Sequence, residues 1–254
     1  MYYFVCYLYR YKTKIITMNT ISYPSAEATA KKLAERIQQE VEKSEVYYLA
    51  LTGGFPAIPL YQALANTPIE WSKVQIYYAS EVMSGQQKGL HHLVAKAHLF
   101  DKIEIPSPNI HPINTDNAPE TEAERYAQEI LKTLPKVGGA PRFDMVLMDM
   151  TKDGHVAGIF AGQHDIFLEE PIAFANAHPS HGDQHVTLSI PTIEGAKGLA
   201  LYAFGGEARF AIGDIINLLP EAKEYPANFI ASRCPWIYLY ADAESMREKS
   251  YSIY

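Results

Sequence analysis

The stretch Met145-Val146-Leu147-Met148-Asp149-Met150-Thr151-Lys152-Asp153-Gly154-His155-Val156-Ala157-Gly158-Ile159-Phe160 decides the fold of this chain. It opens with a short apolar run that does not alternate, which is typical of a strand buried on both faces. The run ends in Lys152-Asp153-Gly154, a composition that favours a turn. An aspartate and a histidine therefore follow the carboxyl end of a predicted parallel strand, and ligands bind at that edge of open α/β sheets.

Asp153 and His155 are the first candidate catalytic pair. An unperturbed imidazole has a pKa of about 6.5, so His155 could accept a proton from water near neutral pH. Asp153 could orient the ring and stabilise its cation, and Gly154 permits the tight backbone that brings both side chains to one cavity. The alternative is an ordinary Asp-Gly turn with a surface histidine. The tripeptide alone favours that alternative. With the predicted buried strand before it, the two interpretations are equally favoured.

Strands and helices alternate on both sides of this stretch. Apolar spacing of three and four residues predicts helices at 25–43, around 60–64, and at 90–100, 121–134, 192–197 and 207–219. Strands are predicted at 46–51, 74–78, 109–113, 145–150, 185–190, 199–204, 229–230 and 236–240, with an irregular segment at 161–183. This order predicts an α/β fold: one domain over residues 18–254 with a doubly wound, mostly parallel sheet and helices on both faces.

Two glycine turns are candidate anion sites at the same edge of the sheet. Thr52-Gly53-Gly54 joins a strand to a helix, so backbone N–H groups, the helix N-terminus and the Thr52 hydroxyl could bind an anion. Gly205-Gly206 does the same before a helix whose first turn carries Arg209. A plain strand-to-helix turn and a solvated arginine are the alternatives. Convergence of these turns with the Asp153–His155 turn predicts a site for a phosphorylated small molecule.

Composition narrows the class of protein. The chain has 254 residues, 48% hydrophobic and 20% charged, which is typical of a folded protein. A net charge of −7 opposes nucleic-acid binding but leaves room for a local phosphate site. Cys6 and Cys234 lie far apart without metal-ligand spacing, which favours a reducing, cytoplasmic location and no metal. No apolar run has the length of a membrane span, so we expect no membrane partner.

The first seventeen residues differ from the rest of the chain. Basic residues follow the apolar ones here, the reverse of a signal peptide. More ordinary sequence begins at Met18. We therefore expect Met18 to be the natural start and residues 1–17 to be a non-native or disordered extension, which the intact mass of the native protein would decide.

Several of these stretches resemble the 6-phosphogluconolactonase family, which is related to glucosamine-6-phosphate isomerase/deaminase. Residues 52–57, Thr-Gly-Gly-Phe-Pro-Ala, resemble the family loop Ser-Gly-Gly-Ser-Thr-Pro. Residues 148–162 resemble its central signature Leu-Gly-Met-Gly-x-Asp-Gly-His-x-Ala-Ser-Leu-Phe-Pro-Gly. Gly206-Glu207-Ala208-Arg209 is similar to a family Gly-x-x-Lys, and Pro226-Ala227 to a closing Pro-Ala.

The resemblance implies a NagB/RpiA-like fold and hydrolysis of 6-phosphogluconolactone in the pentose phosphate pathway. It implies His155 as the base that assists water, Asp153 as its orienting partner, and no cofactor or metal. The expected partner is a small phosphorylated sugar lactone, and the expected assembly is a monomer or a small homo-oligomer.

Some family positions are changed in this chain. The family's Asp-Glu-Arg is Ser80-Glu81-Val82, its strand arginine is His185, and its lysine is Arg209. Glu81, the one retained acid of its motif, is the third candidate catalytic residue. The candidate substrate-binding residues are Thr52, Gly53, Gly54, His185 and Arg209.

The changed positions leave two alternative functions open. One is a related isomerase or deaminase, which needs a carboxylate base. The other is a non-catalytic sugar-phosphate-binding protein. The sequence also leaves open whether His181 or His185 enters the site, while His91 and His92 are expected at a rim or on the surface.

Overall fold

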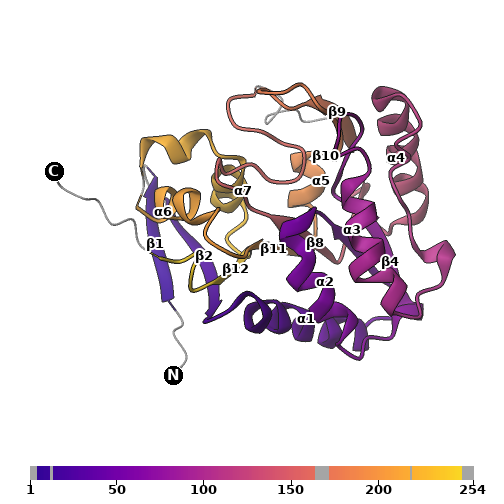
Figure 1. Cartoon of the computed structure of the whole chain (residues 1–254), viewed down its shortest axis with the longest axis horizontal. Helices are drawn as coiled ribbons and strands as arrows, with labels where there is room; N and C mark the ends of the chain where they lie inside the picture. Colours follow the sequence, from indigo (N-terminus) through magenta and orange to yellow (C-terminus); the bar gives the residue numbers. More distant parts are fainter. Residues whose placement is uncertain (1–4, 12–13, 164–171, 218, 248–254) are drawn as a thin grey trace.

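A seven-stranded sheet forms the centre of the computed structural model, which describes residues 5–11, 14–163, 172–217 and 219–247 (Figure 1). Its strand order is β1-β2-β12-β11-β8-β3-β4. The pairs from β2 across to β4 are parallel, and β1 pairs antiparallel with β2 at one edge. The predicted mostly parallel α/β sheet is therefore confirmed.

The strands of the three sheets are β1 (Val5–Tyr11), β2 (Lys14–Tyr23), β3 (Tyr47–Leu51), β4 (Val74–Tyr78), β5 (Ser80–Val82), β6 (Lys136–Val137), β7 (Ala140–Pro141), β8 (Met145–Asp149), β9 (Ala173–Ala177), β10 (Gln184–Leu188), β11 (Gly198–Ala203) and β12 (Tyr238–Asp242). The α-helices are α1 (Ala26–Glu42), α2 (Ile58–Ala65), α3 (Leu90–His98), α4 (Pro119–Thr133), α5 (Ile190–Glu194), α6 (Arg209–Asn217) and α7 (Pro226–Arg233). Figure 1 shows α1 and α2 on one side of the main sheet and α5 and α7 on the other.

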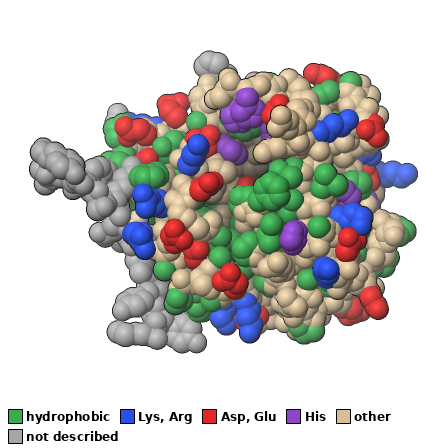
Figure 2. Space-filling model, in the orientation of Figure 1, with side chains coloured by type: hydrophobic (Ala, Val, Ile, Leu, Met, Phe, Trp, Pro, Cys, Tyr) green, Lys and Arg blue, Asp and Glu red, His purple; other side chains and the backbone are tan. Residues whose placement is uncertain are grey.

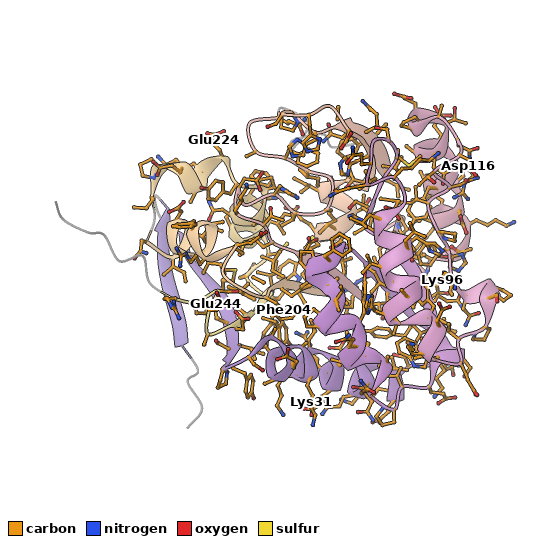
Figure 3. All side chains as sticks on the ribbon, viewed as in Figure 1. Lys31, Lys96, Asp116, Phe204, Glu224 and Glu244 are labelled. Carbon is orange, nitrogen blue, oxygen red and sulfur yellow. The ribbon has the colours of Figure 1, made fainter. Side chains whose placement is uncertain are left out.

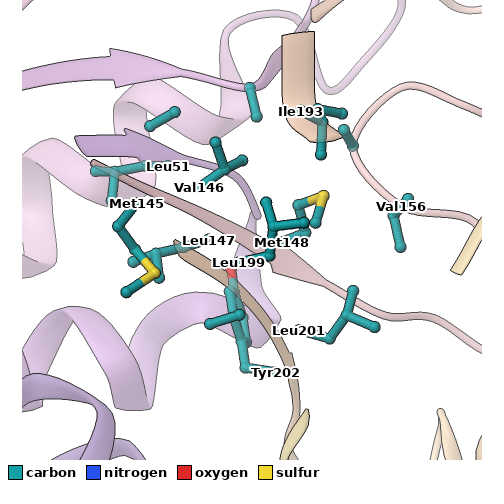
Figure 4. Close-up of a cluster of buried hydrophobic side chains, with 14 of the residues drawn as sticks. Leu51, Met145, Val146, Leu147, Met148, Val156, Ile193, Leu199, Leu201 and Tyr202 are labelled. Atoms are coloured by element: carbon teal, nitrogen blue, oxygen red, sulfur yellow. The ribbon is translucent and has the colours of Figure 1, made fainter. Parts of the chain in front are cut away.

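Strand β8 lies at the centre of the core, between β11 and β3. Its residues Met145 to Met148 are fully buried, and Figure 4 shows them packed among Leu199, Leu201 and Tyr202 of β11. Both faces of the strand are covered, which explains why its sequence is apolar without alternation. Burial of each such side chain stabilises the fold by about 1.5–3 kcal/mol, so the turn that follows β8 begins from a rigid support.

Helix α1 shows how the sequence pattern becomes packing. The Ser25 hydroxyl accepts a hydrogen bond from the Ala28 N–H at 3.2 Å and caps the helix. Apolar residues at helical spacing, Leu33 and Ile37 among them, are fully buried. Charged side chains point outward, as Lys31 of α1 and Lys96 of α3 do in Figure 3.

A second, three-stranded antiparallel sheet, β5-β10-β9, stands on the carboxyl edge of the main sheet. Ala79 joins the two sheets: its N–H donates to the Leu51 carbonyl at 2.7 Å, and its carbonyl accepts from the Leu188 N–H at 2.7 Å. The register places His185 opposite Val82, and Val186 opposite Glu81. The small sheet thus brings β10 over the ends of β3 and β8.

Two predicted strands and one predicted irregular segment differ from the structure. The predicted strand 109–113 is wrong: a 3₁₀ turn covers Ser107–Asn109 and a single bridge joins Ile110 to Ile76, because neighbouring prolines lack the N–H groups that a strand needs. The predicted strand 229–230 lies inside α7, since an apolar pair is too short to distinguish a helix from a strand. Strand β9 lies within the segment 161–183 that was expected to be irregular.

The predicted boundary at Met18 falls inside β2, and the Met18 side chain is 5% exposed. Strand β1 pairs with β2 in the register Tyr7 opposite Met18. Whether Met1 or Met18 is the natural start stays a prediction. Within the described residues, no helix has the length and apolar character needed to cross a membrane.

Candidate active site

The turn after β8 is held by close packing around Gly154. Gly154 has a φ of +69°, and a Cβ atom there would lie 2.4 Å from Cγ of Tyr225. The Gly154 carbonyl also accepts a hydrogen bond from the Ala227 N–H at 3.0 Å. Only glycine combines this positive φ with the lack of space for a Cβ atom. The close packing on Tyr225 and the hydrogen bond from Ala227 fix the turn against the start of α7.

The turn brings three side chains into one hydrogen-bonded group. Nδ1 of His155 lies 2.8 Å from Oδ1 of Asp153 and 2.9 Å from Oγ1 of Thr151. The Thr151 hydroxyl donates to the same Asp153 oxygen at 2.7 Å. A carboxylate only accepts, so this network assigns the ring proton to Nδ1 and leaves the lone pair on Nε2.

The Asp153 carboxyl is kept ionised by its neighbours. Burial acts to raise the pKa of Asp153, but the hydrogen bond and charge of His155 and the bond from Thr151 outweigh it and hold that pKa below its usual range. Asp153 therefore carries its negative charge throughout the neutral range, as a partner that stabilises an imidazolium must.

His155 opens onto a cavity of about 230 Å³ at the carboxyl edge of the main sheet. Four parts of the chain line it: the loop after β3, the residues before and within α3, the turn after β8, and the segment from β9 into β10. The lining residues are Gly54, Phe55, Pro56, Val82, Gln87, Leu90, His91, Asp149, Thr151, His155, Ala157, Phe160, His178, His181, Asp183 and His185. Figure 2 shows histidine side chains grouped beside a hollow in the upper part of this face.

His185, one of the predicted substrate-binding residues, lies in the wall of this cavity. It is 8% exposed, its ring lies 5.2 Å from that of Phe160, and its Nδ1 has no hydrogen-bond partner within the described chain. Burial lowers the pKa of His185 to about 3, and repulsion from His91, His155 and His178 adds to this. His185 is therefore a neutral imidazole, with one buried ring nitrogen that has no hydrogen-bond partner among the described residues.

The low pKa of His185 predicts acid sensitivity of the fold. Between pH 6.5 and pH 3 the unfolded chain binds a proton at His185 that the folded chain does not, so stability falls as the pH falls. We expect His185→Gln to lose less of its melting temperature between pH 7 and pH 4 than wild type, by about 5 °C. His98→Gln, outside the cavity, should keep the wild-type dependence. Parallel curves for wild type and His185→Gln would contradict this assignment.

Of the candidate substrate-binding residues Thr52, Gly53 and Gly54, only Gly54 lines the cavity, together with Phe55 and Pro56 of the same loop. The Thr52 hydroxyl is buried, accepts from the Asp149 N–H at 3.0 Å and lies 3.1 Å from the Leu147 carbonyl. Gly53 has a φ of +111°, and a Cβ there would lie 2.4 Å from the Tyr202 hydroxyl. Thr52 and Gly53 therefore join the end of β3 to β8 and β11 rather than line the cavity.

Thr52→Val tests this structural role. Valine keeps the shape but leaves the Asp149 N–H without its buried acceptor, so the free energy of unfolding should fall by about 1–3 kcal/mol. Thr52→Ser keeps the hydroxyl and should lose less. Denaturant titration measures both, and unchanged stability in Thr52→Val would show that the hydroxyl is not needed there.

Glu81, predicted to be catalytic, is 1% exposed and is not one of the residues that line the cavity. Its Oε1 accepts from the N–H groups of Val82 at 2.8 Å and His91 at 3.0 Å, and its Oε2 from that of His92 at 2.7 Å. The carboxylate thus caps the first turn of α3, where free N–H groups and the helix dipole favour a negative charge. Both its oxygens are already engaged.

Arg209 also lies outside the cavity wall. It begins α6, with its guanidinium carbon 4.6 Å from the centre of the Phe210 ring. The Gly205 N–H before it donates to Asp242 at 2.9 Å. The Gly205-Gly206 turn is therefore bound to the end of β12, and the structure brings the turns after β3 and β8 to the cavity but not this one.

Several cavity residues were not among the predicted site residues. His91 lies at the N-terminus of α3, and its Nδ1 bonds the Ser80 carbonyl at 2.7 Å. His178, His181 and Asp183 come from the β9–β10 connection. His178, His181 and the pair His91–His92 are the signal in the sequence that could have found this part of the site.

Fold and site together define an α/β protein with a histidine–aspartate pair above a cavity at the carboxyl edge of its sheet. The chain belongs to the glucosamine-6-phosphate isomerase/6-phosphogluconolactonase family, whose model matches residues 24–238. It is 30% identical to the 6-phosphogluconolactonase of Haemophilus influenzae over 237 residues, which are 91% of this chain and 99% of that protein.

Solved structures show the same fold. The crystal structure of a devB protein superposes with a TM-score of 0.81 at 28% identity, over 90% of this chain and 98% of that one. The structure of 6-phosphogluconolactonase from Trypanosoma brucei has a TM-score of 0.75 at 20% identity, over 90% of this chain and 97% of that one. The predicted resemblance to this family is confirmed.

Proposed function

We propose that this protein hydrolyses 6-phosphogluconolactone to 6-phosphogluconate, a reaction of the pentose phosphate pathway. The observation that carries the proposal is the hydrogen-bonded group of Thr151, Asp153 and His155 facing the cavity. It leaves one basic nitrogen, Nε2 of His155, free to receive a proton. The names of the relatives support the choice of lactone.

The reaction needs one base that later serves as an acid. Nε2 of His155 takes a proton from water as the water oxygen bonds to the lactone carbonyl carbon. The bond from that carbon to the ring oxygen then breaks, and the ring oxygen receives the proton from the imidazolium. The products are an alcohol and a carboxylic acid, which ionises at neutral pH. His155 returns to its neutral form.

Asp153 and Thr151 would keep the ring in the productive tautomer. Their contacts with Nδ1 orient the imidazole and stabilise its cation, and the lowered pKa of Asp153 keeps the carboxylate charged during the proton transfer. A negative charge also develops on the carbonyl oxygen. We propose that the backbone N–H of Gly54, a residue that lines the cavity at the start of a 3₁₀ turn, stabilises this charge.

We assign Glu81 a positioning role in place of the predicted catalytic one. Its carboxylate fixes the N-terminus of α3, and with it His91 and Leu90 in the cavity wall. We further propose a cytoplasmic enzyme that acts as a monomer or a small homo-oligomer on a soluble sugar phosphate. Light scattering in solution tests the assembly.

A side-by-side assay separates this function from its alternatives. Wild-type protein is mixed with freshly generated 6-phosphogluconolactone, and acid release above the spontaneous rate is recorded. In parallel, ammonia release from glucosamine 6-phosphate is measured. Lactone hydrolysis without ammonia supports the proposal. Ammonia release would favour the deaminase, and ligand-induced thermal stabilisation without either reaction would favour a binding protein.

A further inference from the structure

A cluster of imidazoles surrounds the cavity. The histidine cluster is His91, His178, His181 and His185, and it shares the cavity with His155. The rings of His178 and His181 stack with centres 3.7 Å apart, and the ring of His178 lies 6.4 Å from that of His155. Phe160 lies among them, 4.5 Å from His178 and 5.2 Å from His185. These histidines come from α3, the β9–β10 connection and β10 itself.

The described part of the cavity wall has no permanently charged cationic side chain. None of the described residues that line it is lysine or arginine, while three carboxylates lie in or beside it. Each carboxylate has a hydrogen-bond donor or an ion-pair partner: Asp149 has Thr52 at 3.0 Å, Asp153 has His155, and Asp183 has His181 at 3.1 Å. Among the described residues of this wall, the imidazoles are therefore the side chains that can supply positive charge to a bound anion.

We infer that the histidine cluster binds the phosphate group of the substrate and takes up a proton as it does so. This inference rests on the proposed function, which supplies a phosphate monoester. Burying a dianion without a compensating charge is strongly unfavourable, and histidine is the side chain that gains charge near neutral pH. His185 lines the cavity, is 8% exposed, and has no hydrogen-bond partner for its Nδ1 among the described residues, so its polar ring is not already satisfied by the protein.

The unliganded cluster is poised to gain a proton. Burial lowers the pKa of His178, and repulsion from His181 and His155 adds to this, while Asp153 and Asp183 oppose it. His185 is held neutral by burial and by repulsion from His91, His155, His178 and His181. A phosphate dianion placed among these rings adds a nearby negative charge, which favours imidazolium.

Calorimetric titration of wild-type protein with 6-phosphogluconate tests the inference. Titrations between pH 7 and pH 8, in phosphate-free buffers of different ionisation enthalpy, count the protons bound with the ligand. The phosphate group has a second pKa of about 6, so it contributes little uptake at the upper end of this range. We expect uptake of about one proton, and a Kd that rises up to about tenfold per pH unit. Gluconate, which lacks the phosphate, should show no such uptake.

Three variants sharpen the test. His178→Gln combined with His181→Gln, at the more exposed side of the cavity, should lose most of the uptake and raise the Kd for 6-phosphogluconate at pH 7 by about tenfold or more. His185→Arg supplies a permanent cation and should flatten the pH dependence. His98→Gln, outside the cavity, should behave as wild type. Thermal melts of all three confirm folding.

Binding of 6-phosphogluconate without proton uptake, equal uptake with gluconate, or no binding at all would each overturn the inference. Lactone turnover by the same preparation keeps the two proposals apart. Lactone turnover without phosphate-linked proton uptake would support the proposed lactonase function and contradict the proposed role of the histidine cluster. Phosphate-linked uptake without turnover leaves the anion site and removes the lactonase.

Discussion

His155→Ala is expected to lower kcat for 6-phosphogluconolactone by about 10²–10⁴-fold, the usual cost of losing a general base. The ring is the only part of the Thr151–Asp153–His155 group that can take a proton from water, since Asp153 stays ionised with its Oδ1 bound to both neighbours. The side chain is 22% exposed and packs mainly against Phe160, so the variant should fold. Initial rates, corrected for spontaneous ring opening, measure the effect.

His98→Ala is the matched control for this variant. His98 ends α3 and does not line the cavity, so its loss should leave kcat within about twofold of wild type. Melting curves of both variants separate lost chemistry from lost folding. A well-folded His155→Ala protein with wild-type kcat would rule out His155 as the base.

Glu81→Ala is expected to cause the largest loss of stability, about 3 kcal/mol or more. It leaves the buried N–H groups of Val82, His91 and His92 without an acceptor and removes a negative charge from the N-terminus of α3. The free energy of unfolding from denaturant titration measures the loss. At a temperature where the variant is folded, its kcat should stay within about tenfold of wild type, because Glu81 does not touch the cavity.

Glu81→Gln refines this test. The amide oxygen can still accept from two of the three N–H groups, while its NH₂ group faces the third, so its stability should lie between those of wild type and Glu81→Ala. A kcat loss of about 10²–10⁴-fold in a fully folded Glu81→Gln protein would instead support the catalytic role predicted from the sequence.

The sequence was most informative where the contacts are local. Asp153 and His155 are two residues apart on one turn, so the apolar run of β8 and the Asp-Gly pair together predict both their neighbourhood and their place at the sheet edge. The same holds for α1, where the spacing of Leu33 and Ile37 predicts the buried face. In such segments the backbone geometry follows from the residues themselves.

Contacts between segments that are separated in the sequence could not be predicted from the residues alone. Glu81 and His91 are ten residues apart, and the hydrogen bonds of the folded chain show that the Glu81 carboxylate caps α3. Likewise, the Gly205 N–H donates to Asp242, which holds the second predicted anion turn at the end of β12 and outside the cavity. His178 and His181 follow β9, a strand in a segment whose sequence shows no clear periodicity, so their place in the site was not predicted.

The most direct measurement is the rate at which wild-type protein opens freshly generated 6-phosphogluconolactone, recorded as acid release at several enzyme concentrations. The proposed function predicts a rate that rises in proportion to enzyme, saturates with lactone, and yields 6-phosphogluconate as the product. A rate equal to the spontaneous one at every enzyme concentration, from protein whose melting curve shows that it is folded, would contradict it.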